Sequence, residues 1–147
     1  MKPVLHAASG TLAMLCIASF WVSTAVSELF LDHSAVAFVK RAIVFGLFLL
    51  VPLLILTGLT GTILGKGRKE PLIAKKTKRM RVVAANGLLV LVPAALVLNG
   101  MAAAGRFDAA FFAVQSLELA VGIVQMVLMG LNLRDGLMLS GKRTPSL

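Results

Sequence analysis

Long apolar runs alternate with short polar segments along the chain, and four of these runs are long enough to cross a bilayer. A helix needs about 20 mostly apolar residues to span a hydrocarbon core of ~30 Å. The four runs lie at about residues 4–27, 42–64, 82–104 and 108–133. They predict an all-α integral membrane protein, a single domain over residues 1–147 that forms an up-down bundle of four transmembrane helices in the lipid bilayer.

A row of polar residues follows one face of the last apolar run. Its members are three or four positions apart, so in a helix all of their side chains point the same way. The residues around them are mostly Ala, Val, Leu, Ile and Phe, as expected for a helix surrounded by lipid. This polar stripe should therefore face protein, a cofactor or water, and its members are Gln115, Glu118, Gly122, Gln125, Met129 and Asn132.

Glu118 is the ionisable member of the stripe and lies about ten residues into the run, near the middle of the membrane. A carboxylate at the bilayer centre costs about 3 kcal/mol on insertion scales, so such a residue indicates a functional site. A dry Glu118 would be protonated and donate to a neighbouring helix, whereas a hydrated one would handle protons. Gln115 and Gln125 extend this polar track, which could equally be a seam of hydrogen bonds that fixes helix packing or binds a partner subunit.

The composition excludes an ordinary soluble domain, because 59% of the 147 residues are hydrophobic and the mean hydropathy is +0.94. The net charge of +9 does not indicate nucleic acid binding, because the basic residues sit in short segments beside the apolar runs. Cys16 is the single cysteine and lies inside the first run, so no disulfide is expected. The first run also resembles a secretion signal preceded by Lys2, and we expect it to be retained as a span.

The distribution of basic residues predicts the orientation of the four helices. If the chain enters and leaves on the same side, that side carries twelve of the fifteen Lys and Arg residues. Eight of the twelve lie at 65–81, which we expect to be a solvated inner loop facing lipid headgroups; binding of anionic lipid or of a cofactor carboxylate is the alternative. Because basic loops stay inside, we expect a multi-pass protein of the bacterial inner membrane with both termini in the cytoplasm.

The connection on the opposite side contains one group of candidate metal ligands. Glu28 and Asp32 are four residues apart, and His33 follows directly. Carboxylates and an imidazole together could bind a divalent metal ion or gather protons. A solvated loop in which the two acids pair with Lys40 and Arg41 explains the same residues.

His6 is one of two histidines and lies in the first turns of the first run, at the cytoplasmic edge of the apolar slab. A buried imidazole there needs a partner, which could be haem iron or another metal, a lipid phosphate or a backbone carbonyl. His33 follows 27 residues later, which at ~1.5 Å per residue separates the two imidazoles by most of the membrane. A second ligand for His6 would therefore be Met129 or Met126 of the last run, or His6 of a second copy in a homodimer.

Several short motifs in the first 60 residues carry a family resemblance. A Leu-His pair opens the first run, a Trp follows about fifteen residues later, and the second run contains Pro and Thr-Gly. The motifs stand at positions 4–6, 20–21, 29–33, 50–54 and 57–58. In these positions the chain resembles the four-span bacterial inner-membrane proteins of the copper-resistance D and HemJ-type protoporphyrinogen oxidase group. The resemblance implies a b-type haem with His6 as its ligand, although the last two runs lack the further histidines of HemJ-type chains.

The sequence thus favours an inner-membrane protein that binds haem b and takes part in electron transfer or in haem or porphyrin handling. One alternative is a cofactor-free accessory or assembly subunit of a larger membrane complex. A second alternative is a small proton-coupled transporter that uses Glu118. The expected partners are the lipid bilayer and either a second copy of the chain or a larger membrane complex, with no nucleic acid.

Overall fold

The computed structural model describes residues 2–67 and 71–141, and every regular element in this part of the chain is a helix. The third apolar run is divided into two α-helices by a five-residue π-helical segment, η1, and the three pieces follow one another without a break. The elements are α1 (Lys2–Phe30), α2 (His33–Gly65), α3 (Pro71–Asn86), η1 (Gly87–Leu91), α4 (Val92–Ala103) and α5 (Ala109–Gly141).

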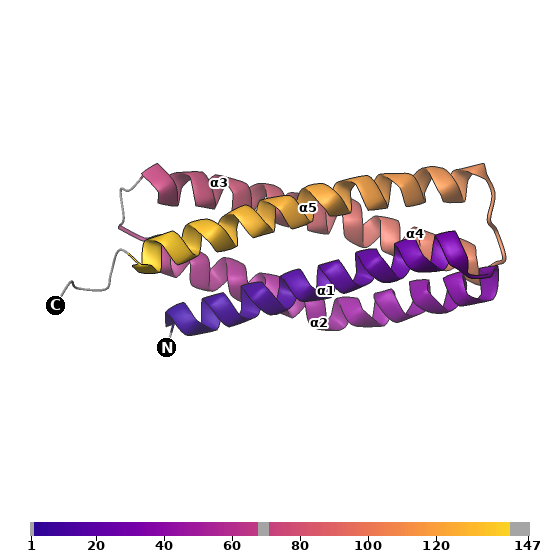
Figure 1. Cartoon of the computed structure of the whole chain (residues 1–147), viewed down its shortest axis with the longest axis horizontal. Coiled ribbons are helices and arrows are strands. Elements are labelled where there is room, and N and C mark those ends of the chain that lie inside the picture. Colours follow the sequence, from indigo (N-terminus) through magenta and orange to yellow (C-terminus); the bar gives the residue numbers. More distant parts are fainter. Residues whose placement is uncertain (1, 68–70, 142–147) are drawn as a thin grey trace.

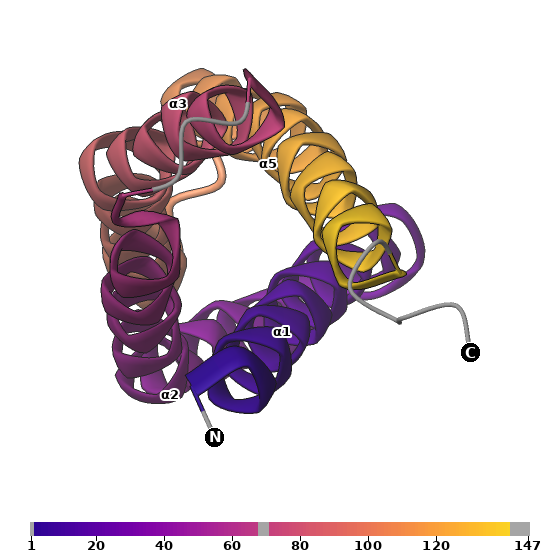
Figure 2. The same ribbon diagram turned by 90° about the vertical axis from the view of Figure 1, so that its left-hand side faces the viewer.

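Four spans run up and down beside one another and surround a common interior (Figures 1 and 2). α1 packs against α2 and α5, and the third span, from α3 to α4, packs against the same two helices. We call the end with the start of α1 and the connection from α2 to α3 the basic end, and the end with the connections at 31–32 and 104–108 the short-loop end. The predicted all-α bundle is confirmed, and the chain is a multi-pass membrane protein.

Two helices begin earlier than the apolar runs predict. α2 begins at His33, well before about residue 42, because the Asp32 side chain accepts a hydrogen bond from the Ala35 backbone N–H at 2.9 Å and caps the helix. α3 begins at Pro71, so the prediction of a loop over 65–81 is wrong for most of that segment. Proline suits the first turn of a helix, and long lysine side chains can extend along a helix to reach water.

The length of the helices explains how the charged segments become helical. α2 and α5 each contain 33 residues, which corresponds to ~50 Å at ~1.5 Å per residue. A hydrocarbon core is only ~30 Å thick, so both helices continue into the headgroup layers. Charged residues in the outer turns therefore remain compatible with a membrane-spanning helix.

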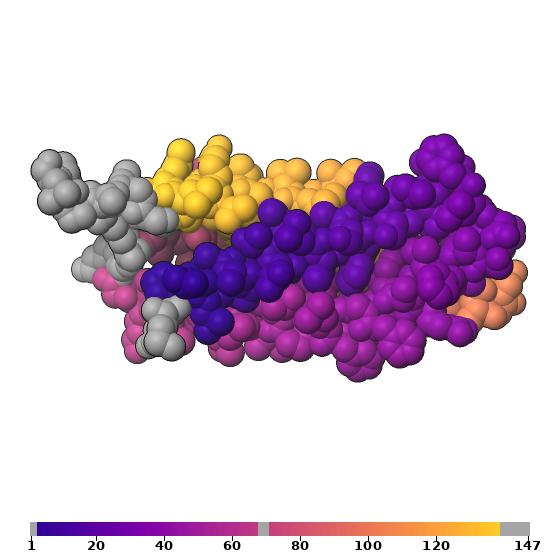
Figure 3. Space-filling view, turned by 60° about the horizontal axis from the view of Figure 1, so that its bottom comes forward, coloured from indigo at the N-terminus to yellow at the C-terminus, as the bar shows by residue number. Residues whose placement is uncertain are grey.

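Many large apolar side chains lie on the outer surface of the bundle. Phe38, Phe48 and Leu89 are 73%, 77% and 71% exposed, as expected for side chains that contact lipid. α1 covers the middle of the face seen in Figure 3, between α5 and α2. Two buried apolar clusters lie inside: a central cluster of Ala13, Ile17, Leu50, Val83 and Met129, and a short-loop cluster of Val36, Leu98, Ala102 and Phe111.

The π-helical segment lies where the third span meets the polar stripe of α5. The Val92 N–H donates to the Gly87 carbonyl oxygen, five residues back, and Pro93 follows without an N–H of its own. The Gln125 side-chain Nε2 donates to the Val83 carbonyl oxygen at 2.9 Å, just before this segment. An α5 side chain thus uses a backbone oxygen of the third span as its acceptor.

Candidate functional site

The polar stripe of α5 lies inside the bundle, in agreement with its spacing. Gln115, Gln125 and Asn132 are only 3%, 0% and 5% exposed, and Met129 is 6% exposed. The Glu118 side chain is 14% exposed. These side chains therefore point to the other three spans rather than to lipid.

Glu118 meets a lysine from α2 near the short-loop end. Lys40 Nζ lies 3.0 Å from Glu118 Oε2, and Lys40 itself is 1% exposed. The alternative in which Lys40 lies in a solvated loop and pairs with Glu28 or Asp32 does not hold, because Lys40 is buried in α2 and contacts Glu118. Lys40 lies within α2 on the same buried face as Val36 and Ile43, because residues three and four positions apart share one face of a helix.

Three further polar side chains surround the Lys40–Glu118 ion pair. Thr24 Oγ1 accepts from Lys40 Nζ at 3.5 Å, and Gln115 Nε2 donates to Glu118 Oε2 at 3.1 Å. Glu28 follows Thr24 by one helical turn, and its charge interacts with those of Lys40 and Glu118. We call Thr24, Glu28, Lys40, Gln115 and Glu118 the short-loop charge cluster.

Glu28, Asp32 and His33 do not form the predicted metal site. Among residues 2–67 and 71–141, no group of three or more His, Cys, Asp or Glu side chains could hold a metal ion. Asp32 caps α2, and the His33 ring stacks on Phe107 with centroids 4.0 Å apart. Neighbours in sequence therefore take up three separate structural roles.

The two exposed aspartates of the short-loop end are helix caps. Asp32 Oδ1 accepts from the Ala35 N–H at 2.9 Å, and Asp108 Oδ1 accepts from the Phe111 N–H at 3.1 Å. Each backbone donor stabilises the charged carboxylate and lowers the pKa of Asp32 and of Asp108 below its ordinary value. Both groups are therefore ionised at neutral pH.

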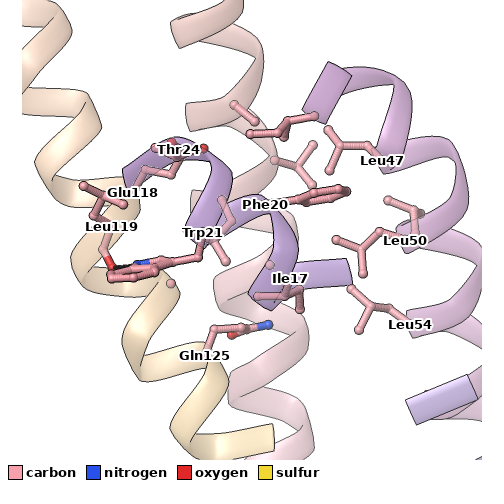
Figure 4. A pocket seen from close by; sticks show the side chains of 17 residues that line it. Ile17, Phe20, Trp21, Thr24, Leu47, Leu50, Leu54, Glu118, Leu119 and Gln125 are labelled. Atoms are coloured by element: carbon pink, nitrogen blue, oxygen red, sulfur yellow. Dashed lines mark hydrogen bonds between the residues drawn. The ribbon is translucent and has the colours of Figure 1, made fainter. Parts of the chain in front are cut away.

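A small cavity of about 70 Å³ lies in the middle of the bundle (Figure 4). Trp21 closes one side of it, because its Nε1 donates to the Leu119 carbonyl oxygen at 3.0 Å. A Cβ on Gly122 would come within 2.9 Å of Trp21 Cδ1, so the glycine leaves room for the indole. Glu118 and Gln125 also line this cavity, and Gln125 Oε1 is buried without a hydrogen-bond donor from the described residues.

At the basic end, α3 and α5 are joined by a buried ionic network. Arg79 donates to Asp135 Oδ2 at 2.7 Å and to Asn132 Oδ1 at 3.2 Å. Asp135 is 1% exposed and also accepts from Arg134 at 3.2 Å. Arg79, expected in a solvated loop, thus extends the polar stripe across to α3.

A larger cavity of about 250 Å³ lies beside this network, and we call it the basic-end cavity. All four spans contribute to its wall. A Cβ on Gly58 would meet no atom within 4 Å, so the α2 backbone itself borders open space. The wall also includes His6, Gly61, Lys76, Met129 and Asn132.

The His6 imidazole has hydrogen-bond partners only at its Nδ1 atom within the described residues. Its Nδ1 lies 3.0 Å from the Thr57 carbonyl oxygen and 3.1 Å from Thr60 Oγ1. A carbonyl only accepts, so Nδ1 carries the proton and Nε2 keeps its lone pair. Within the described residues Nε2 has no hydrogen-bond partner, and the ring fits closely against Gly61, whose added Cβ would lie 3.1 Å from His6 Cε1.

The two methionines predicted as second ligands differ in their position. Met129 lines the basic-end cavity together with His6. Met126 lines neither cavity and packs against the central apolar cluster. Of the two, only Met129 remains a candidate ligand.

Sequence reasoning missed Lys40, Arg79 and Asp135 as interior residues. The spacing of Val36, Lys40 and Ile43 could have predicted that Lys40 faces the interior, because the three residues share one helical face. Asp135 continues the stripe three residues after Asn132. Arg79 had no such pattern, because its partner is 56 residues away in the sequence.

Comparison with known proteins adds no relative: no family model, no curated protein and no solved structure matches the chain.

Proposed function

We propose that this chain binds one b-type haem in the basic-end cavity, where His6 Nε2 would hold the iron, and acts in electron transfer or in haem or porphyrin handling. The supporting observation is the hydrogen bond from His6 Nδ1 to the Thr57 carbonyl, while Nε2 keeps an open lone pair at the cavity. Metal-bound histidines commonly donate their second N–H to a backbone carbonyl or a carboxylate. Haem would supply a redox-active iron whose potential its axial ligands set.

The residues around the cavity fit this group. An added Cβ on Gly58 would meet no atom within 4 Å, so a flat ring could approach the α2 backbone at this position. Met129 offers a thioether, and a His/Met pair is a known haem ligation that raises the potential. Lys76 at the wall offers a cation for a propionate. The cavity volume of about 250 Å³ is just below the ~300–1,000 Å³ of small-molecule sites.

The orientation and assembly belong to the same proposal. Twelve of the fifteen basic residues lie on one side of the spans, which supports a bacterial inner membrane protein with both termini and the basic-end cavity towards the cytoplasm. A homodimer could bring a second His6 as the other axial ligand. Met129 in the same cavity would make that second copy unnecessary for ligation.

The test is a titration of the purified, detergent-solubilised protein with hemin, followed by its Soret absorbance. Wild type should give a saturable Soret band with one hemin per chain, and His6→Ala should lose it. His33→Ala is the matched control, because His33 stacks on Phe107 at the other end of the bundle and should leave the band unchanged. The proposal fails if wild type gives no band, or if His6→Ala binds hemin as well as wild type.

A second candidate function is proton-coupled transport, and the buried Lys40–Glu118 ion pair favours it. Proton-linked substrate flux in liposomes that is lost in Glu118→Gln and kept in His6→Ala would support it over haem binding. Colourless protein that copurifies with other membrane subunits would instead support the accessory-subunit alternative.

A further inference from the structure

The short-loop charge cluster brings two carboxylates against one ammonium group. Glu118 Oε2 takes the short contact with Lys40 Nζ, at 3.0 Å. Glu28 lies one turn after Thr24, whose hydroxyl also contacts Lys40, and the charges of Lys40, Glu118 and His33 act on it. If its three ionisable groups, Glu28, Lys40 and Glu118, were all charged, the net charge of the cluster would be −1.

Within the described residues, only Lys40 and His33 carry charge that counteracts a charge on Glu28. α4 has no ionisable residue, and from α2 only His33 and Lys40 face Glu28. His33 lies against Phe107 at the end of the helix. Lys40 is already in short contact with Glu118, and an uncompensated charge in this low-dielectric interior is strongly unfavourable.

The unpaired atoms of the cluster are acceptors. Glu28 Oε1 and Gln115 Oε1 are both buried, and neither receives a hydrogen bond from the described part of the chain. The orientation of the Gln115 amide is fixed, because its Nε2 must face the Glu118 carboxylate at 3.1 Å. Gln115 is only 3% exposed, so its free oxygen is shielded from bulk solvent. The cluster therefore has too few hydrogen-bond donors for its acceptors.

We propose that Glu28 and Glu118 share one exchangeable proton opposite Lys40, taken up from the short-loop side of the membrane. The proton adds to one carboxylate oxygen as an O–H group, and no other bond forms or breaks. The net charge of the cluster then becomes zero, and the new O–H supplies the missing donor. This proton site does not depend on haem binding at the other end.

Infrared spectroscopy of the purified protein in H₂O and D₂O tests the site through the carbonyl stretch of a protonated carboxylic acid. Wild type at neutral pH should show one such group per chain, with a band that shifts in D₂O. Glu28→Gln should lose the band, and so should Glu118→Gln, because one carboxylate then faces one ammonium and both are ionised. Lys40→Met should double the band, since both carboxylates lose their counterion.

Controls separate this result from other acids and from misfolding. Asp108→Asn should leave the band unchanged, because Asp108 is an exposed, ionised cap that pairs with Arg106 at 2.9 Å. Glu70 lies outside the described residues, so Glu70→Gln serves as a second background. If a single variant loses its helical circular dichroism, the double variant Lys40→Met/Glu118→Gln replaces it and should keep one band. The proposal is overturned if wild type shows no band, or if the band survives in folded Glu28→Gln or Glu118→Gln.

Discussion

The two ends of the bundle surround the buried polar residues of α5 in different ways. Both bury polar residues of the α5 stripe, yet at the basic end the side chains leave a cavity of about 250 Å³ beside an imidazole with an open lone pair. At the short-loop end the side chains meet directly, as in the 3.0 Å contact of Lys40 with Glu118. The comparison teaches that the neighbouring helices decide whether a polar stripe becomes a binding site or an ionic cluster.

The difference comes from residue size on the facing helices. α2 presents Gly58 and Gly61 to the basic end but the long Lys40 to the short-loop end. The central apolar cluster, which includes Ile17 and Leu50, lies between the two regions. We therefore expect substitutions at one end to leave the properties of the other end unchanged.

The largest expected effect compares the acid partners at the two ends. Asp135→Asn removes the carboxylate that contacts Arg79 at 2.7 Å, and within residues 2–67 and 71–141 no other carboxylate pairs with this arginine, so the free energy of unfolding should fall by about 3–5 kcal/mol. Glu118→Gln should cost clearly less, because Glu28 can become the counterion of Lys40. Unfolding in a denaturing detergent, followed by circular dichroism, measures both. Equal losses of unfolding free energy in the two variants would contradict the proposed difference between the two ends.

The next effect concerns the packing between the two ends. In Gly122→Ala the new Cβ would come within 2.9 Å of Trp21 Cδ1, so the indole must move and the protein should lose about 1–3 kcal/mol of stability. Gly100→Ala is the control, since an added Cβ there meets nothing within 4 Å. Trp21 fluorescence and thermal melting report the change, and a neutral Gly122→Ala would show that the indole is loosely held.

A smaller effect should be confined to the basic end. Gly58→Leu adds a side chain at the cavity wall, where an added Cβ would meet no atom within 4 Å. Hemin affinity should fall at least tenfold, which is about 1.4 kcal/mol. The carboxylic acid band of the short-loop end should not change. Unaltered hemin affinity would mean that the ligand does not use this wall.

The smallest effect is the pH dependence of the exposed caps. The pKa values of Asp32 and Asp108 are lowered in the folded state, mainly by the backbone N–H groups that they cap. Their contribution to stability is therefore present above the unfolded pKa of about 3.9 and is lost as the pH falls through the lower folded value. Asp32→Asn keeps a capping side chain and should weaken this dependence. Thermal melting across acidic pH checks it, and an unchanged profile would exclude Asp32 as a contributor.

The sequence predicts the number of spans and the inward stripe well, because both depend on periodicity within one helix. It fails at the starts of α2 and α3, since hydropathy does not detect an Asp32 cap or lysines that extend to water. It also reads Lys40 and Arg79 as solvated, because their partners Glu118 and Asp135 come from α5, far away in the sequence. The cavity beside His6 depends on four helices together and has no sequence pattern of its own.

The central claim is that the open lone pair of His6 is a ligand position. The most direct test is hemin binding by His6→Gly with and without added imidazole, which can enter the space left by the side chain and replace its nitrogen. The account predicts that His6→Gly is colourless alone and regains the wild-type Soret band with imidazole, while His33→Gly binds hemin without it. Wild-type protein that stays colourless with hemin, or a His6→Gly band that does not depend on imidazole, would contradict the claim.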